Sequence, residues 1–309
     1  SAASDVYKRQ VVDRVFFDKA LAKDAAKAGA KILLKTAATG LIWKDGKVAG
    51  VKAISNGEEI EILADAVVGA DGYESQIGRW AGIDTSLKPN DILTCYQYRL
   101  TNIKYDSDYC EFVLGSAAPG GYVWVFPKTD DTANVGLGVL TTLIKNPGDP
   151  KMYLDKFIAE TPGLKDGQPL ECVAGAVSVC APLDSVCIDH VILVGDAARQ
   201  IDPITGGGIS NSCIAGMFAG KALAKAKETG DYTMNTFQEY EANWRDRLEN
   251  KLWRNWMAKE KLVTLDDATL DSLVKTISEV GVKKLSVRNL LAVVKEKHPD
   301  LVKEFEDLI

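Results

Sequence analysis

The stretch VILVGDAARQIDPITGGGI, residues 191–209, decides the fold of this 309-residue chain. It opens with four apolar residues, which is typical of a strand buried on both faces. Gly195 and Asp196 end that strand, and an acid there is suited to ribose-type hydroxyls. The triple glycine at 206–208 lets the backbone approach a flat ligand and begins a helix whose first amides favour negative charge. The stretch therefore predicts an α/β fold with a ligand site at the end of this strand.

A second stretch repeats the arrangement earlier in the chain. The apolar run 66–70 is followed directly by Asp71 and Gly72, and we expect this run also to be a strand buried on both sides. Two interpretations of the later stretch stay open, because the glycines are also compatible with a flexible turn and Asp196 with a helix cap. The presence of two such strand ends favours a ligand site over that structural reading.

Working outward, hydrophobic periodicity and turn residues predict the remaining elements. Before the decisive stretch we expect a helix that ends at Gly29, strands at 31–34, 36–44, 47–51 and 59–63, a helix at 75–81, strands at 94–100, 109–114, 121–126 and 134–140, and a helix at 151–160. After it we expect a helix from 208, a charged helical region beyond Tyr232, and helices at 270–277 and 287–295. In the charged region, apolar residues recur every four positions and form one face: Tyr240, Trp244, Leu248, Leu252 and Trp256.

Composition and charge exclude several classes of function. The net charge is −6, whereas a nucleic-acid partner would require a basic face. The chain has six cysteines without a C-x-x-C pair and only two histidines, so we assign no metal and expect reduced thiols. Residues 1–10 lack an apolar signal region and are interpreted as a non-native junction. We expect a cytoplasmic protein, with peripheral membrane contact as a further possibility for the apolar helix face.

These motifs resemble the FAD-dependent superfamily that shares the fold of the aromatic hydroxylases. The resemblance implies cofactor contacts at Gly195 and Asp196, at Asp71 and Gly72, and along the helix start. Arg14 is similar to a cofactor-contacting arginine of that superfamily, and Ala38 to a backbone contact with the adenosine end. The implied cofactor-binding set is Arg14, Ala38, Asp71, Gly72, Gly195, Asp196, Gly207, Gly208 and Ile209.

The resemblance also implies a domain plan. The superfamily's G-x-G-x-x-G unit has no counterpart here, so we expect an N-terminally truncated, Rossmann-like FAD-binding domain. The expected parts are a partial FAD-binding domain at 11–90, an antiparallel β substrate domain at 91–187, a return to the FAD-binding domain at 188–230 and a C-terminal helical subdomain at 231–309. The fold class is therefore α/β, with an α+β character from the separate antiparallel sheet. Ser212 stands where the superfamily more often has a small apolar residue.

The segment PGGYVWVFPK, residues 119–128, narrows the resemblance to the geranylgeranyl reductases. Alternation along a strand puts Tyr122, Trp124 and Phe126 on one face, where three rings would line a channel for a long apolar chain. The alternative is that these rings are the ordinary core of a sheet. Likeness to the whole motif favours the channel.

The family resemblance implies FAD-dependent reduction of isoprenoid C=C bonds in a prenylated lipid or prenyl diphosphate. The sequence does not identify the external electron donor, for which a ferredoxin, NAD(P)H and a reduced deazaflavin stay open, and no catalytic acid is identified. Lys251, Arg254 and Arg288 are weak candidates for a lipid phosphate, because a solvated charge explains each of them better. A flavin-dependent monooxygenase or halogenase remains the alternative enzyme, and a non-catalytic lipid-binding protein the alternative of another class.

Overall fold

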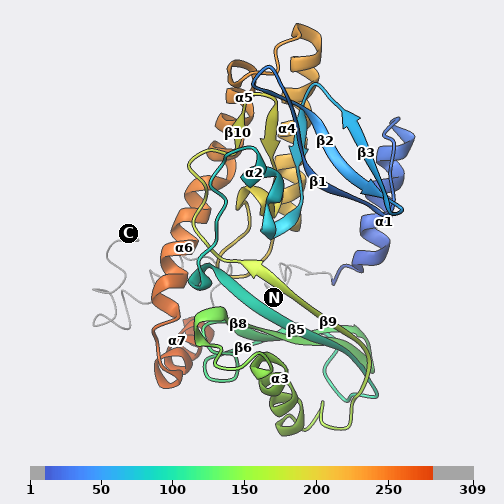
Figure 1. Cartoon of the computed structure of the whole chain (residues 1–309). Helices are drawn as coiled ribbons and strands as arrows, with labels where there is room; N and C mark the ends of the chain where they lie inside the picture. Colours follow the sequence, from blue (N-terminus) through green and yellow to red (C-terminus); the bar gives the residue numbers. More distant parts are fainter. Residues whose placement is uncertain (1–10, 281–309) are drawn as a thin grey trace, which may run out of the picture.

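The computed structural model describes residues 11–280, and Figure 1 shows them as two lobes joined by a long helical segment at one side. The upper lobe holds the two short sheets and most of the helices, and the lower lobe holds a large sheet. The predicted mixed α/β architecture with a separate antiparallel sheet is confirmed.

The upper lobe is organised by a parallel strand pair. Strand β11 (Val191–Leu193) lies between β10 (Cys187–Ile188) and β4 (Val67–Gly69), antiparallel to the former and parallel to the latter. An antiparallel meander of β1 (Thr36–Lys44), β2 (Lys47–Ser55) and β3 (Glu58–Leu63) lies beside them. The parallel pairing brings the two Asp-Gly strand ends to the same edge, although more than 120 residues separate them.

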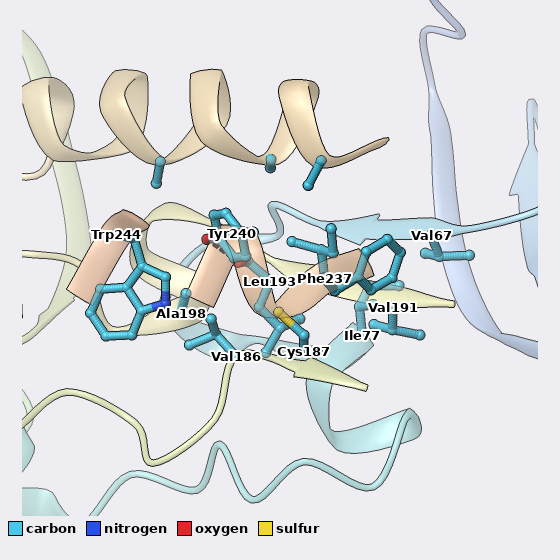
Figure 2. Close-up of a cluster of buried hydrophobic side chains, with 14 of the residues drawn as sticks. Val67, Ile77, Val186, Cys187, Val191, Leu193, Ala198, Phe237, Tyr240 and Trp244 are labelled. Atoms are coloured by element: carbon cyan, nitrogen blue, oxygen red, sulfur yellow. Dashed lines mark hydrogen bonds between the residues drawn. The ribbon is translucent and has the colours of Figure 1, made fainter. Parts of the chain in front are cut away.

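Helices cover this sheet on the core side. The lobe contains α1 (Arg14–Lys27), α2 (Gln76–Trp80), α4 (Ile209–Thr229) and α5 (Met234–Trp244). Figure 2 shows Phe237 of α5 near Val191 and Tyr240 near Leu193, with Trp244 farther along the helix beside Ala198. All six side chains are fully buried. The Tyr240 hydroxyl donates to the Leu193 carbonyl at 2.7 Å and accepts from Gln200 Nε2 at 2.9 Å. Burial of these large rings, together with the Tyr240 hydrogen bond, holds β11 against α5.

The lower lobe is a five-stranded antiparallel sheet in the order β6-β7-β8-β5-β9. Its strands are β5 (Ile92–Thr101), β6 (Glu111–Leu114), β7 (Tyr122–Thr129), β8 (Thr132–Leu140) and β9 (Gln168–Ser178). One face packs on α3 (Asp149–Glu160), with Val123, Val125, Leu137 and Leu154 fully buried. The opposite face looks toward the upper lobe (Figure 1).

A continuous helical segment connects the lobes. Helix α5 passes through a π-helical turn (Arg245–Glu249) into α6 (Asn250–Leu262), and α7 (Asp267–Val280) follows. Tyr240, Trp244, Leu248 and Leu252 are all at most 5% exposed, which confirms the predicted apolar stripe, whereas Trp256 is only half-buried. An α-helix has 3.6 residues per turn, so side chains spaced every four residues gradually rotate around its axis. The π-helical turn has more residues per turn, and it brings the later side chains back to the same side.

Three expectations need correction. Residues 31–34 are not a strand: Leu34 is 77% exposed, Lys35 turns the chain with φ +49°, and no partner strand lies alongside within the described residues. Strand β4 lies at a sheet edge rather than fully inside, and Val68 is 40% exposed. Strand β9 was not predicted at all. The helix expected at 287–295 lies outside the described residues.

An ion pair at the start of α1 links the two lobes. This helix has no buried residue, so its apolar side chains Phe17, Leu21 and Ala25 do not enter a core. Its N-cap residue Asp13 forms an ion pair with Lys128 of β7, with 2.8 Å between Oδ2 and Nζ. None of the helices in residues 11–280 has the length and apolar composition that a membrane span requires.

Candidate functional site

A cavity of about 610 Å³, called the glycine-loop cavity here, lies at the carboxyl end of β11. Its wall is formed by α1, the turns after β4 and β11, the start of α4 and Val177 of β9. Seven of the predicted cofactor-binding residues line it together: Arg14, Gly72, Gly195, Asp196, Gly207, Gly208 and Ile209. Such a volume is within the usual range for a small-molecule or cofactor site.

Two predicted contacts lie outside this lining. Asp71 Oδ2 accepts a hydrogen bond from the Ile77 amide at 2.9 Å and so caps the short helix α2. Ala38 is exposed on β1, away from the glycines. The chain neighbours of Asp71, Ala70 and Gly72, do line the cavity, so this segment is at the site although the Asp71 side chain bonds to α2.

Asp196 is the acidic group beside the glycines, and Asp18, the other acidic residue of the lining, pairs with Arg14 at 2.9 Å. Asp196 sits in the turn Gly195–Ala198, where burial raises the pKa of its carboxyl while the charges of Arg199 and Arg14 act in the opposite direction. A Cβ on Gly208 would lie 2.8 Å from Asp196 Oδ1. The glycine is therefore required so that the carboxylate and the helix start share one small space.

The loop at 202–208 is held by Asp202. Asp202 Oδ1 accepts from the Ile204 and Thr205 amides at 3.1 and 3.3 Å, and its carbonyl accepts from the Gly206 amide at 2.8 Å. The other carboxylate oxygen, Oδ2, accepts from Asn255 Nδ2 at 2.8 Å and pairs with Lys251 Nζ at 3.2 Å. Asp202 thus fixes the loop internally and attaches it to α6.

The loop delivers the N-terminus of the long helix α4 to the cavity. This helix has 21 residues, no side-chain hydrogen bond at its N-cap Gly208 and no acidic residue in its first turn. Helix N-termini carry partial positive charge and free amide donors. The site therefore places the positive end of α4 beside Gly207, Gly208 and Ile209, with the Asp196 carboxylate next to it.

Arg199 ties the two Asp-Gly turns to each other, and sequence reasoning did not assign it a role. The side chain is 1% exposed, and its guanidinium donates to the carbonyls of Tyr73 and Asp196 at 2.7 and 3.1 Å and to that of Thr85. Ser75 Oγ adds a 2.8 Å bond to the Ala197 carbonyl. The sequence gives no local pattern for this role, because two of the carbonyls that Arg199 contacts, those of Tyr73 and Thr85, come from a distant segment. They reach it only when β4 pairs with β11.

The predicted alignment of Tyr122, Trp124 and Phe126 on one face is confirmed. Their ring centroids are 5.8 and 6.2 Å apart in sequence order, and Phe112 of β6 lies against the two outer rings. We call these four residues the aromatic row. Val123 and Val125 point to the opposite face and are fully buried there, so the row is not part of that core.

The aromatic row occupies space that glycine creates. Gly136 of β8 is opposite Trp124, and a Cβ there would lie 2.5 Å from Trp124 Cζ2. Trp124 Nε1 donates to Gln97 Oε1 at 2.9 Å, which fixes the indole over β8 and β5. The row is therefore a defined surface of this sheet that faces the upper lobe.

A second cavity of about 340 Å³, called the apolar cavity, lies at the Tyr122 end of the row. It is bounded by β5, the 115–121 loop, α6 and the start of α7. The lining includes Leu93, Tyr122, Leu143, Ile204, Leu262 and Leu270, and it also includes Lys259 and Asp267. Most of the wall is apolar, which suits a hydrocarbon chain.

One loop separates the two cavities. Pro203 and Ile204 line the apolar cavity, while Gly206–Gly208 line the glycine-loop cavity. The Tyr122 hydroxyl donates to the Thr205 carbonyl between them. Burial raises the pKa of Tyr122 to about 12, so this donor stays protonated at neutral pH.

The weak phosphate candidates have other places. Lys251 is paired with Asp202, and the Arg254 side chain is half-buried with Nε lacking a hydrogen-bond partner in the described part of the chain. Arg288 is outside the described residues.

The site fits a flavin adenine dinucleotide on its own chemistry. Asp196 is a buried acceptor for hydroxyls, and the α4 N-terminus favours anionic groups. Arg14 lines the cavity as the partner of Asp18, and the glycines allow a flat ring system to approach the backbone.

Comparisons with known proteins identify the family of this chain. The family model for the geranylgeranyl reductase catalytic domain matches residues 91–177, which contain the large sheet. Digeranylgeranylglycerophospholipid reductases of Thermoplasma volcanium and Thermoplasma acidophilum are 49% and 48% identical over 97% of this chain and 76% of their own length.

Solved structures show the same relationship. A geranylgeranyl bacteriochlorophyll reductase-like protein from Thermoplasma acidophilum superposes with a TM-score of 0.91 and 46% identity, over 98% of this chain and 78% of that one. The flavin-dependent brominase Bmp2 has a TM-score of 0.66 at 19% identity over 96% of this chain and 69% of its own, which shows a shared fold alone. The chain belongs to the digeranylgeranylglycerophospholipid reductase family.

Proposed function

We propose that this chain binds FAD in the glycine-loop cavity and reduces C=C bonds in the geranylgeranyl chains of a glycerophospholipid. The observation that carries the proposal is the shared loop at 202–208, which faces both cavities. A lipid chain on the aromatic row and in the apolar cavity would thus lie next to the cofactor.

The flavin supplies the hydride when it is bound and reduced. The α4 N-terminus would favour the negative charge of the reduced cofactor, and Asp196 would hold its ribose-type hydroxyls. Arg199 would keep the two turns around the cofactor in one arrangement through its three carbonyl contacts.

The aromatic row would position the reacting chain. Its rings present a smooth apolar surface without a charged group among the four side chains, so successive double bonds could be brought to the same place by sliding. Tyr122 belongs to both the row and the loop contact, and we infer that it sets the distance between chain and cofactor. Closely packed apolar walls also exclude water from the reacting bond.

Product analysis tests this function. The protein is loaded with FAD, reduced anaerobically with dithionite and given a digeranylgeranyl glycerophospholipid, and the lipid is examined by mass spectrometry. We expect a gain of two hydrogen atoms for each double bond reduced. Ferredoxin, NADPH and a reduced deazaflavin are then compared as donors. Recovery of the unchanged lipid with flavin bound would refute the proposal, and oxygen-dependent hydroxylation or halogenation would favour the alternative enzymes.

A further inference from the structure

Lys259 places a buried positive charge in the wall of the apolar cavity. Its side chain is 7% exposed, and it lines the cavity among apolar residues such as Leu262 and Leu143. Removing an ammonium group from water is unfavourable unless partners compensate for the lost hydration. A hydrocarbon chain alone provides no such partner.

The partners of Lys259 within the described residues leave donors available. Its ammonium pairs with Glu260, the next residue on α6, which does not line the cavity and is one-third exposed. Glu260 also accepts from Asn90 Nδ2 at 3.3 Å. An ammonium has three donors, and the ion pair with Glu260 occupies one side of it.

The second charged residue of the lining is already engaged. Asp267 accepts from the Ser116 amide at 2.8 Å and from Ser116 Oγ at 2.6 Å, one bond to each carboxylate oxygen. These two hydrogen bonds hold the start of α7 against the 115–121 loop. Asp267 is therefore a structural group of the cavity wall, and Lys259 is the charged group that remains for a ligand.

We propose that Lys259 binds the phosphate of an isoprenoid phosphate ester whose chain extends from the apolar cavity along the aromatic row. This inference rests on the proposed function and specifies the orientation of its substrate, with the anionic end at α6 and the chain running from Tyr122 toward Phe126. Charge-assisted hydrogen bonds to a buried ammonium are stronger than neutral ones, so the phosphate adds affinity that the matched alcohol lacks.

Binding of a matched pair tests the inference without any turnover. Farnesyl phosphate and farnesol, both below their aggregation limits, are titrated calorimetrically into the FAD-loaded protein at constant ionic strength. We expect farnesyl phosphate to bind about 10- to 100-fold more tightly than farnesol. Lys259→Met should reduce this ratio to less than threefold with little change for farnesol. Lys259→Arg should preserve most of it.

The control is Lys261→Met, which removes a lysine of the same helix outside the cavity lining. It should keep the wild-type ratio. Melting temperatures check folding, and we expect Lys259→Met to fold because apolar replacement of a buried charge is often neutral or stabilising. If it does not fold, Lys259→Gln takes its place.

Each result has a separate meaning. Equal binding of the two ligands by wild-type protein, or a preference that survives in Lys259→Met, would overturn the inference while leaving the proposed chain site intact. Failure to bind either ligand would overturn both. Farnesyl diphosphate and dihexanoyl glycerophosphate extend the test: Lys259-dependent binding of either supports the inference, and the tighter of the two identifies the source of the phosphate.

Discussion

The side-chain amide of Asn255 donates to Asp202 Oδ2 at 2.8 Å, and both residues are buried. Asp202 holds the loop that separates the two cavities, and one turn beyond Asn255 the same helix contributes Lys259 to the apolar cavity. Together with the ion pair between Lys251 and Asp202, this hydrogen bond connects α6, which borders the apolar cavity, to the loop that borders the glycine-loop cavity.

Asn255→Ala should loosen that connection. It leaves a buried carboxylate oxygen with Lys251 as its remaining partner, and we expect a loss of about 1–3 kcal/mol in the free energy of unfolding. FAD affinity should fall as well, because the ion pair with Lys251 is then the remaining attachment of Asp202 to α6. Urea unfolding and flavin fluorescence titration measure the two effects. Asn235→Ala, at an exposed position of α5, is the control, and an Asn255→Ala protein as stable as this control would contradict the account.

Asp196→Asn should separate stability from cofactor binding. Burial raises the folded-state pKa of Asp196, because it disfavours the charged carboxylate. The stability that comes from a neutral Asp196 is therefore fully present below the unfolded-state pKa and is lost as pH rises through the folded-state pKa. At pH 7 the wild-type protein carries an ionised buried carboxylate, whereas the amide is neutral. We expect the variant to melt about 1–3 °C higher at pH 7, with the difference disappearing near pH 3.5.

The same variant should bind FAD more weakly, by about tenfold or more, because the amide is a poorer acceptor for hydroxyls than a carboxylate. The exposed Asp184→Asn serves as control for both measurements. The account would be contradicted if the wild-type protein were more stable than Asp196→Asn at pH 7 and both proteins bound FAD equally well. Asp196 would then be a structural cap.

Gly136→Ala should displace Trp124. The new Cβ would lie 2.5 Å from the indole and 2.8 Å from Gln97 Cβ, so the ring must leave the aromatic row. Overpacking of this kind costs about 1–3 kcal/mol. Tryptophan fluorescence and thermal melting detect the change. Gly175→Ala on β9 is the matched control, because a Cβ there meets nothing within 4 Å, and equal effects of the two substitutions would be inconsistent with a packed row.

Tyr240→Phe tests the support of the strand that presents the site. It leaves the Leu193 carbonyl and Gln200 Nε2 without their buried partner, and we expect a loss of about 1–3 kcal/mol of stability. Gln200 Oε1 accepts from the Gly195 amide at 2.8 Å, so the disturbance should reach the cofactor turn. Tyr109→Phe, at a residue that is 69% exposed, should be neutral by the same melting experiment.

The sequence was informative where a local pattern carries the structure. Apolar runs ending in Asp-Gly or Gly-Asp located β4 and β11, and alternation placed Tyr122, Trp124 and Phe126 on one face. The four-residue apolar spacing from Tyr240 to Leu252 marked the buried stripe, although the π-turn that keeps it aligned has no simple sequence signal.

Contacts between distant segments were not predictable in this way. Strand β9 lacks regular alternation and most of its residues are exposed, so its pairing with β5 defines it. Asn255 and Asp202 are far apart in sequence, and Lys259 looks like one more charge on an amphipathic helix until α7 and the 115–121 loop close over it. Residues 31–34 show the opposite error, an apolar run with no strand to pair with.

Anaerobic reoxidation of the reduced flavin tests the central claim most directly. Photoreduced FAD-loaded protein is mixed with digeranylgeranyl glycerophospholipid or with its fully saturated counterpart, and the flavin absorbance is followed without oxygen. The account predicts reoxidation only with the unsaturated lipid, in proportion to the double bonds lost. A flavin that stays reduced with both lipids, yet reoxidises when oxygen is admitted, would contradict it.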